Sequence, residues 1–226
     1  MTRDAMSRGG GGGGEIERRA ERQTLVYRIG RIMCRMWVDR AFDLKVYNAN
    51  YVPRRGGVLI VSNHQSYLDP VLLAVKLHRP LSYMAKSELF ENPFLAWLIR
   101  NLNAYPVRQG EGDVGAVKET IRRLQEGHAL NLYPEGTRSP DGTLQPLLPG
   151  VGLIVRRAGV PVVPAVIAGS FEAWPKDSML WLQRPVQVMY GPPMDLKGLK
   201  AGEIVQKIEV TLRRMFDELR ERISKE

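Results

Sequence analysis

The chain has 226 residues, which suits a single domain with a sizeable core, and 44% of them are hydrophobic, an ordinary share for a globular protein. Its 33 lysines and arginines outnumber 24 acidic residues, and the resulting net charge of +9 predicts an anionic partner: nucleic acid, membrane surface or phosphate-bearing substrate. One cysteine, Cys34, excludes an internal disulfide, three histidines disfavour a metal site, and no apolar run reaches the roughly 18 residues that span a bilayer.

The first 45 residues predict a tail followed by a helical segment. Residues 1–14 end in six glycines and predict a disordered tail, because glycine loses the most conformational entropy on ordering. Residues 15–45 predict an amphipathic helical segment with arginines between the apolar positions. Its apolar stripe comprises Leu25, Ile29, Ile32, Met33, Met36 and Trp37. Two interpretations stay open and do not exclude each other: the helix packs on the core, or it lies in a membrane surface, which the Met and Trp content of its apolar face favours.

In residues 46–226 strands alternate with helices, and we expect this part of the chain to be the domain that carries the function. Strands are expected at 58–62, 81–85, 104–107, 130–133, 160–167 and 186–190. Helices are expected at 70–75, 88–102, 114–126, 151–158 and from residue 203 onward. This alternation is typical of the α/β class, so we expect a single domain with a mostly parallel or mixed central sheet flanked by helices.

Polar side chains follow four of the expected strands at the point where each strand ends. His64 and Asp69 follow the first, Lys86 the second, Arg108 the third, and the run Glu135-Gly136-Thr137-Arg138 the fourth. If these strands are parallel neighbours, their carboxyl ends meet at one edge, where α/β sheets bind ligands. A base, a carboxylate and three cations gathered there suit a substrate that carries a hydroxyl beside a phosphate.

His64 and Asp69 form a potential base and orienter, because a hydrogen-bonded carboxylate fixes the tautomer of a histidine and raises its basicity. The competing interpretation is that Asp69 caps a helix whose first residue is Pro70. A five-residue step would not place both side chains on one face of a straight helix, so the pair meets only if His64 lies in the preceding turn. No serine or cysteine nucleophile is evident, which favours direct base catalysis on a substrate hydroxyl.

The remaining candidates also have plainer interpretations. Lys86 is compatible with a solvated loop lysine, and Arg108 with a surface charge in a glycine-rich loop. The stretch from Pro134 to Thr137 is compatible with an ordinary turn, since proline and glycine favour one.

Four sequence blocks follow one another in a recognisable order. They are Asn63-His64 with Asp69, Tyr105-Pro106-Val107-Arg108, Tyr133-Pro134-Glu135-Gly136-Thr137-Arg138-Ser139 and Val160-Pro161-Val162-Val163-Pro164. Together they resemble the four blocks of the glycerolipid acyltransferase family, most closely the bacterial 1-acyl-sn-glycerol-3-phosphate acyltransferases. The resemblance covers about residues 58–190 and implies the same α/β fold.

The resemblance implies a role for each matching residue. His64 would be the general base and Asp69 its orienter. Arg108, with Glu135, Gly136, Thr137 and Arg138, would bind the acceptor. The two arginines would bind its phosphate, which their forked guanidinium groups suit, and Lys86 would be a third cation. Glu135 would organise the acceptor pocket or its arginines rather than transfer protons. Backbone amides near Gly136 or at the helix start after His64 are both candidates for the oxyanion donor.

Two departures from the family pattern are visible. Tyr133 stands where phenylalanine is common, and Pro146-Leu147-Leu148-Pro149-Gly150 stands where many members have a lysine. One cation expected near the acceptor is therefore missing. The apolar residues Phe90, Phe94, Trp97 and Leu98 are expected to pack in the core, with an acyl groove as the alternative.

The implied function is transfer of a fatty acyl group from an acyl thioester to the sn-2 hydroxyl of lysophosphatidic acid (1-acyl-glycerol-3-phosphate). The product would be phosphatidic acid for phospholipid synthesis. The donor would be acyl-CoA or acyl carrier protein, with no cofactor. Alternatives are another lysolipid acceptor or a non-catalytic lipid-binding module.

The expected surroundings of the enzyme are the cytoplasmic face of the cell membrane, with peripheral or monotopic attachment to its anionic surface. Nucleic acid is not expected as a partner. The sequence has no zinc-finger spacing and none of the aromatic and basic interleaving of an RNA-binding motif.

Overall fold

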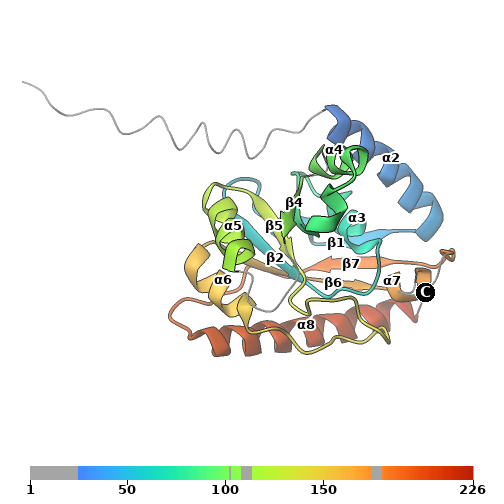
Figure 1. Cartoon of the computed structure of the whole chain (residues 1–226). Coiled ribbons are helices and arrows are strands. Elements are labelled where there is room, and N and C mark those ends of the chain that lie inside the picture. The colour runs from blue at the N-terminus through green and yellow to red at the C-terminus, as the bar shows by residue number, and fades with distance from the viewer. Residues whose placement is uncertain (1–24, 102, 108–113, 175–179, 226) are drawn as a thin grey trace, which may run out of the picture.

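The structure is a computed structural model that describes residues 25–101, 103–107, 114–174 and 180–225 (Figure 1). The tail expected at residues 1–14 and the start of the expected helical segment, 15–24, lie outside the described residues.

A seven-stranded sheet with the order β1-β7-β6-β2-β5-β3-β4 forms the centre of the fold. The strands are β1 (Lys45–Tyr47), β2 (Val58–Ser62), β3 (Ser82–Lys86), β4 (Ala104–Val107), β5 (Ala129–Leu132), β6 (Val162–Ala168) and β7 (Gln187–Tyr190). Strands β2 to β6 run parallel, whereas β7 pairs antiparallel to β6 and parallel to β1. The α/β class with a mixed sheet is therefore confirmed.

Helices cover both faces of the sheet, as Figure 1 shows. On one face lie α2 (Leu25–Phe42) and α3 (Asp69–Ala74); on the other lie α5 (Val114–Gln125), α6 (Gly150–Ala158) and α8 (Ala201–Ile223). The remaining elements are α4 (Pro93–Asn101), α7 (Ser170–Ala173), η1 (Ala49–Tyr51) and η2 (Ser87–Phe90). Because both faces are covered, β2 and β6 are buried at every residue, which explains why their sequences are continuous apolar runs.

The topology brings the ends of four strands to one edge. Strands β2, β5, β3 and β4 are parallel neighbours in that order. This is the arrangement that the polar segments after these strands need in order to lie at one edge of the sheet. Strand β6 lies on the other side of β2. The loop after β2 therefore has a neighbouring strand end on each side.

The expectation of one continuous helix over 88–102 is wrong. The segment is divided into η2 and α4 by Glu91 and Asn92, and Pro93 is the first residue of α4. Proline lacks an amide hydrogen and disfavours helical geometry in the residue before it. The Asn92 side chain instead accepts a hydrogen bond from the Leu95 amide at 3.1 Å, as helix caps do. Core packing is also wrong for Phe94 and Trp97, which are exposed and stack on each other at 6.2 Å.

Helix α2 turns its expected apolar stripe outward. All six stripe residues are between 39% and 69% exposed, while the helix packs through Tyr27, Val38, Ala41 and Phe42. The helix therefore packs on the core through a face other than the stripe, and the stripe stays exposed apart from the contact of Trp37 with Trp181. Within the described residues, no helix is both long and apolar enough to cross a bilayer.

Gly57, just before β2, permits a close approach to α5. A Cβ at this position would lie 1.9 Å from the carbonyl oxygen of Leu124 and 2.9 Å from Cγ1 of Val160. We expect Gly57→Ala to lower the free energy of unfolding by about 1–3 kcal/mol in urea denaturation, because the backbone must move. The control Gly202→Ala, at a site with no atom within 4 Å of the new Cβ, should leave stability unchanged or raise it. Equal stabilities of the two variants would contradict the close approach.

Candidate active site

The site is built on the loop that leaves the end of β2, and Asn63 fixes its start. The Asn63 amide donates to the carbonyl of Ile167 at 2.9 Å and accepts from the Ile167 amide at 2.8 Å. The side chain thus takes the place of a backbone partner for β6. Asn63 is fully buried, so this pairing holds the end of β2 against β6 where the loop begins.

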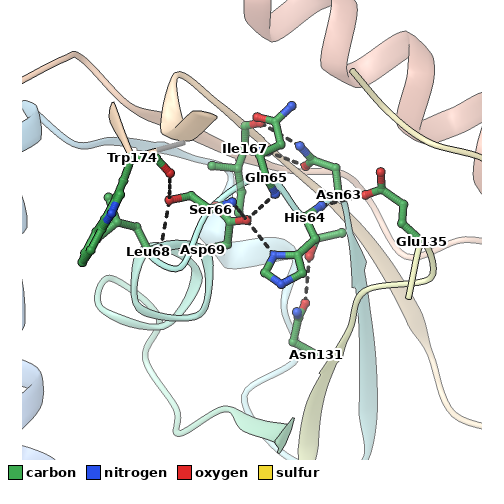
Figure 2. A network of polar contacts seen from close by, with 11 residues as sticks. Asn63, His64, Gln65, Ser66, Leu68, Asp69, Asn131, Glu135, Ile167 and Trp174 are labelled. Carbon is green, nitrogen blue, oxygen red and sulfur yellow. Dashed lines mark hydrogen bonds and ion pairs between the residues drawn. The ribbon is translucent and has the colours of Figure 1, made fainter. Parts of the chain in front are cut away.

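His64 and Asp69 meet in the geometry that the sequence required. His64 lies in the turn before α3, and its Nδ1 is 2.8 Å from Oδ2 of Asp69 (Figure 2). The same oxygen accepts hydrogen bonds from the backbone amides of Gln65 at 2.6 Å and Ser66 at 2.8 Å. The interpretation of Asp69 as a helix cap is wrong, because the N-cap position is Leu68 and the carboxylate turns back onto the preceding loop.

The contacts of Asp69 decide which nitrogen of His64 is basic. The carboxylate is fully buried, and its Oδ2 accepts two backbone amide hydrogens besides its contact with the ring. A carboxylate only accepts, so Nδ1 carries the hydrogen and Nε2 keeps its lone pair. No described residue hydrogen-bonds Nε2, and the side chain keeps 19% of its surface exposed. The imidazole is therefore set to accept a proton from a bound hydroxyl.

Tyr133 supports one face of the imidazole. Its ring stacks on His64 with 3.9 Å between centroids and 16° between planes. Burial raises the pKa of the Tyr133 hydroxyl well above 10, and the nearby Asp69 charge acts in the same direction. The phenol therefore stays neutral and serves as a flat support for the base.

Glu135 fixes the backbone of the same loop. The buried carboxylate accepts from the His64 amide through Oε1 and from the Gln145 amide through Oε2, both at 2.7 Å. The Ser139 amide donates in turn to the His64 carbonyl at 2.7 Å. Both carboxylate oxygens are thus occupied by the protein, which supports an organising role and not direct contact with a substrate.

The turn after Glu135 brings Arg138 beside the β2 loop. Gly136 has a φ of 74°, and a Cβ there would lie 2.6 Å from Leu148, so the turn favours glycine. Thr137 is exposed. The guanidinium of Arg138 lies 3.5 Å from the ring centroid of Tyr67, three residues after His64, in a cation–π contact. Arg138 is therefore held close to the base.

Of the two other predicted cations, the structure places the backbone of Lys86 alone. Lys86 is the last residue of β3, where its backbone pairs with Val107 of β4, and Arg108 lies outside the described residues. At the usual strand spacing, β3 and β4 lie roughly 10 and 15 Å from β2. Arg138, on the loop after β5, is the predicted cation nearest to His64 in strand order.

The structure narrows the choice of oxyanion donor. The amides of His64, Gln65, Ser66 and Gly136 already donate to protein acceptors, with Gly136 bonded to the Tyr133 carbonyl at 3.1 Å. These four amides are therefore already used within the protein and are not open donors for the oxyanion of a tetrahedral intermediate.

Sequence reasoning missed several residues that position the loop. Asn63 and Tyr133 are described above; Gln65 donates to the Gly142 carbonyl at 2.6 Å, and Ser66 Oγ donates to the Trp174 carbonyl at 2.9 Å. The available signal was a run of polar residues, Asn63 to Ser66, directly after a buried strand. Such a run must satisfy its polar groups internally when it is buried.

The fold is an α/β fold, and the loop after β2 holds a histidine whose ring is bound by a buried carboxylate. No serine or cysteine among the described residues hydrogen-bonds the His64 ring. A family model described as Acyltransferase matches residues 43–168, more than half of the sequence. The chain belongs to this family and is an acyltransferase, as its four sequence blocks predicted.

Individual relatives agree with this assignment. The chain is 27% identical over 184 residues to the 1-acyl-sn-glycerol-3-phosphate acyltransferase of Bacillus subtilis, covering 80% of this chain and 89% of that protein. It is 32% identical over 172 residues to the enzyme of that name from Pseudomonas aeruginosa, covering 72% and 65%. The crystal structure of the 1-acyl-sn-glycerophosphate acyltransferase of Thermotoga maritima matches with a TM-score of 0.74 and 28% identity, covering 92% of this chain and 88% of that chain.

The protonation of Glu135 should couple stability to pH. Burial raises the pKa of its carboxyl to about 7 from 4.5, the Asp69 charge adds to this, and the amides of Gln145 and His64 oppose it. Because the folded pKa lies above the unfolded one, the stabilisation is complete below pH 4.5 and is lost as the pH rises through about 7.

Glutamine does not titrate, so Glu135→Gln should not lose this stabilisation. We therefore expect the free energy of unfolding of Glu135→Gln, minus that of the natural protein, to rise by on the order of 3 kcal/mol as the pH increases through this range. Denaturant unfolding of both proteins at a series of pH values measures the difference, in which the other titrating groups cancel. A difference that stays constant between pH 4.5 and 7 would show that Glu135 does not titrate there.

Proposed function

We propose that this acyltransferase moves a fatty acyl group from a thioester to the sn-2 hydroxyl of 1-acyl-glycerol-3-phosphate, giving phosphatidic acid for phospholipid synthesis. The observation that carries the proposal is the orientation of His64, whose Nδ1 is held by Asp69 while no described residue hydrogen-bonds Nε2. The names of the relatives support the acceptor: two bacterial enzymes and a solved structure act on 1-acylglycerol phosphates.

In the proposed reaction, Nε2 of His64 takes the proton of the acceptor hydroxyl as its oxygen attacks the thioester carbonyl. The negative charge of Asp69 stabilises the imidazolium that forms, and the Tyr133 ring holds the imidazole plane. Collapse of the tetrahedral intermediate breaks the carbon–sulfur bond, and the imidazolium returns the proton to the departing thiolate. The acceptor is the nucleophile, so the mechanism uses no acyl-enzyme.

The phosphate of the acceptor would bind the cations at the same edge. Arg138 is assigned the main role because the loop after β5 is adjacent to His64, and its planar guanidinium suits two phosphate oxygens. Lys86 and Arg108 are proposed as further cations, with Gly136 and Thr137 shaping the turn that carries Arg138. Glu135 is assigned to holding the loop.

The proposed donor is acyl-CoA or acyl carrier protein, and no further cofactor is proposed because a thioester is already an activated acyl group. We also propose that the protein attaches peripherally to the anionic cytoplasmic face of the membrane. Supporting this are the exposed apolar stripe of α2, the exposed Arg28 and Arg40 beside it, and the net charge of +9.

His64→Ala should lower kcat by at least about 100-fold, because the base that deprotonates the hydroxyl is lost. Formation of phosphatidic acid and release of free thiol, measured together with each donor, test this. His78→Ala, which removes an exposed histidine, serves as the control and should retain activity. Turnover by a folded His64→Ala variant would remove His64 as the base.

Arg138→Ala should raise KM for 1-acyl-glycerol-3-phosphate by about tenfold or more, because charge-assisted hydrogen bonds to phosphate are lost. Arg138→Lys should restore part of the affinity through charge alone. Steady-state kinetics measures this. For an acceptor that lacks the phosphate, the KM of Arg138→Ala should equal that of the natural protein. An equal effect on both acceptors would place Arg138 outside the phosphate site.

Ile32→Gln with Met36→Gln should weaken binding to vesicles of phosphatidylcholine and phosphatidylglycerol, because two exposed apolar side chains of α2 no longer enter the bilayer. Vesicle co-sedimentation measures this. Unchanged binding would remove α2 as a membrane contact.

A further inference from the structure

A second exposed apolar segment lies next to α2. Leu180, Trp181 and Leu182 are 75%, 39% and 52% exposed, an unusual concentration of apolar surface in one short stretch. The segment follows α7 and leads to β7, and in Figure 1 the chain entering β7 lies beside the C-terminal end of α2. The Leu182 amide donates to the Ala173 carbonyl at 2.7 Å, which fixes the segment to the end of α7.

Aromatic rings join this segment to α2. Trp181 lies edge-on to Trp37 at 5.7 Å and to Phe42 at 5.5 Å, and Trp37 lies edge-on to Phe42 at 5.3 Å. Between α2 and the segment is a groove of about 420 Å³, lined mainly by Met33, Met36, Trp37, Arg40, Trp181 and Gln183. The stripe of α2 and residues 180–182 therefore form one continuous apolar surface.

The same segment is connected to the active-site loop. It follows β6, whose carboxyl end lies at the edge that carries His64. Ser66 Oγ donates to the Trp174 carbonyl at 2.9 Å, and the Tyr67 and Trp174 rings are 6.0 Å apart. A partner that docks on residues 180–182 is therefore brought to the edge where the acyl acceptor must arrive.

We propose that residues 180–182 are a second membrane-binding element, which enters an anionic phospholipid bilayer together with the stripe of α2. This inference rests on the proposed attachment of α2 to the membrane. Tryptophan and leucine are residues that settle at the boundary of headgroups and acyl chains. Arg28, Arg40 and Arg184 are exposed and form no ion pair within the described part of the chain, so they complement anionic headgroups.

Two contacts fix more of the orientation than one. A single helix lying in the interface leaves the rest of the protein free to rotate about the helix axis. A second contact at 180–182 removes this rotation and turns the His64 edge toward the lipid surface. The acceptor, itself a membrane lipid under the proposed function, then reaches the base without leaving the bilayer.

The test compares three double variants by co-sedimentation with vesicles of phosphatidylcholine, with and without phosphatidylglycerol. Leu180→Gln/Leu182→Gln alters the new element, and Ile32→Gln/Met36→Gln alters α2. Leu153→Gln/Val210→Gln is the matched control, which removes exposed apolar side chains from α6 and α8 on the other face of the sheet. Thermal unfolding of each variant verifies that it is folded.

We expect Leu180→Gln/Leu182→Gln to bind anionic vesicles at least about tenfold more weakly, and the control variant to bind like the natural protein. The activity of Leu180→Gln/Leu182→Gln should fall more on acceptor embedded in vesicles than on a short-chain monomeric acceptor, because only the embedded acceptor requires docking.

The outcomes separate this inference from the proposed function. If only the α2 variant is released from vesicles, α2 docks alone and the inference about residues 180–182 is overturned. If all variants bind like the natural protein, the proposed attachment through α2 fails as well. If Leu180→Gln/Leu182→Gln dissociates a dimer in light scattering but still binds vesicles, the segment is a contact between two copies, and the inference is overturned.

Discussion

The carboxylate of Asp69 is the group on which the active edge depends. One of its oxygens receives the His64 ring and two backbone amides, so a single buried charge shapes the loop and sets the histidine tautomer at once. A buried charge is costly unless it is hydrogen-bonded, and these three donors to Oδ2 offset part of that cost. Two tyrosines of the sheet anchor the helix that carries Asp69: Tyr83 donates to the Pro70 carbonyl, and Tyr190 donates to the Leu73 carbonyl.

A second carboxylate acts on the same loop from the opposite side. Glu135 binds the His64 amide while Asp69 binds the ring, so the base is fixed through both its backbone and its side chain. The two negative charges disfavour each other, which contributes to the raised pKa of Glu135. Because Glu135 belongs to the turn that also carries Arg138, the group proposed to bind phosphate and the group proposed to remove the proton share one rigid support.

The outer surface and the active edge fit a substrate that resides in a membrane. The apolar stripe of α2 lies on the outside of the protein, where it cannot stabilise the core, and the Trp37, Phe42 and Trp181 rings extend it toward the loop after α7. Exposed apolar surface of this kind is retained where a partner covers it. In the proposed membrane attachment, the basic charge and the apolar surface would act together, since headgroups would attract the arginines while acyl chains would accept the apolar side chains.

The sequence by itself determined the α/β class, the positions of the central strands and the polar segments at their ends, because buried parallel strands appear as short apolar runs that end abruptly. Periodicity could not say which side of α2 faces the sheet, since an apolar stripe for the core and one for a membrane have the same period; packing of Val38 and Phe42 decided it. Only the tertiary structure stacked Tyr133 on His64, turned Asp69 back onto the loop, and gave both oxygens of Glu135 to backbone amides. The contacts of His64 with Tyr133 and Glu135 join the loops after β2 and β5, which lie about 70 residues apart in the sequence, and no local pattern records such a distance.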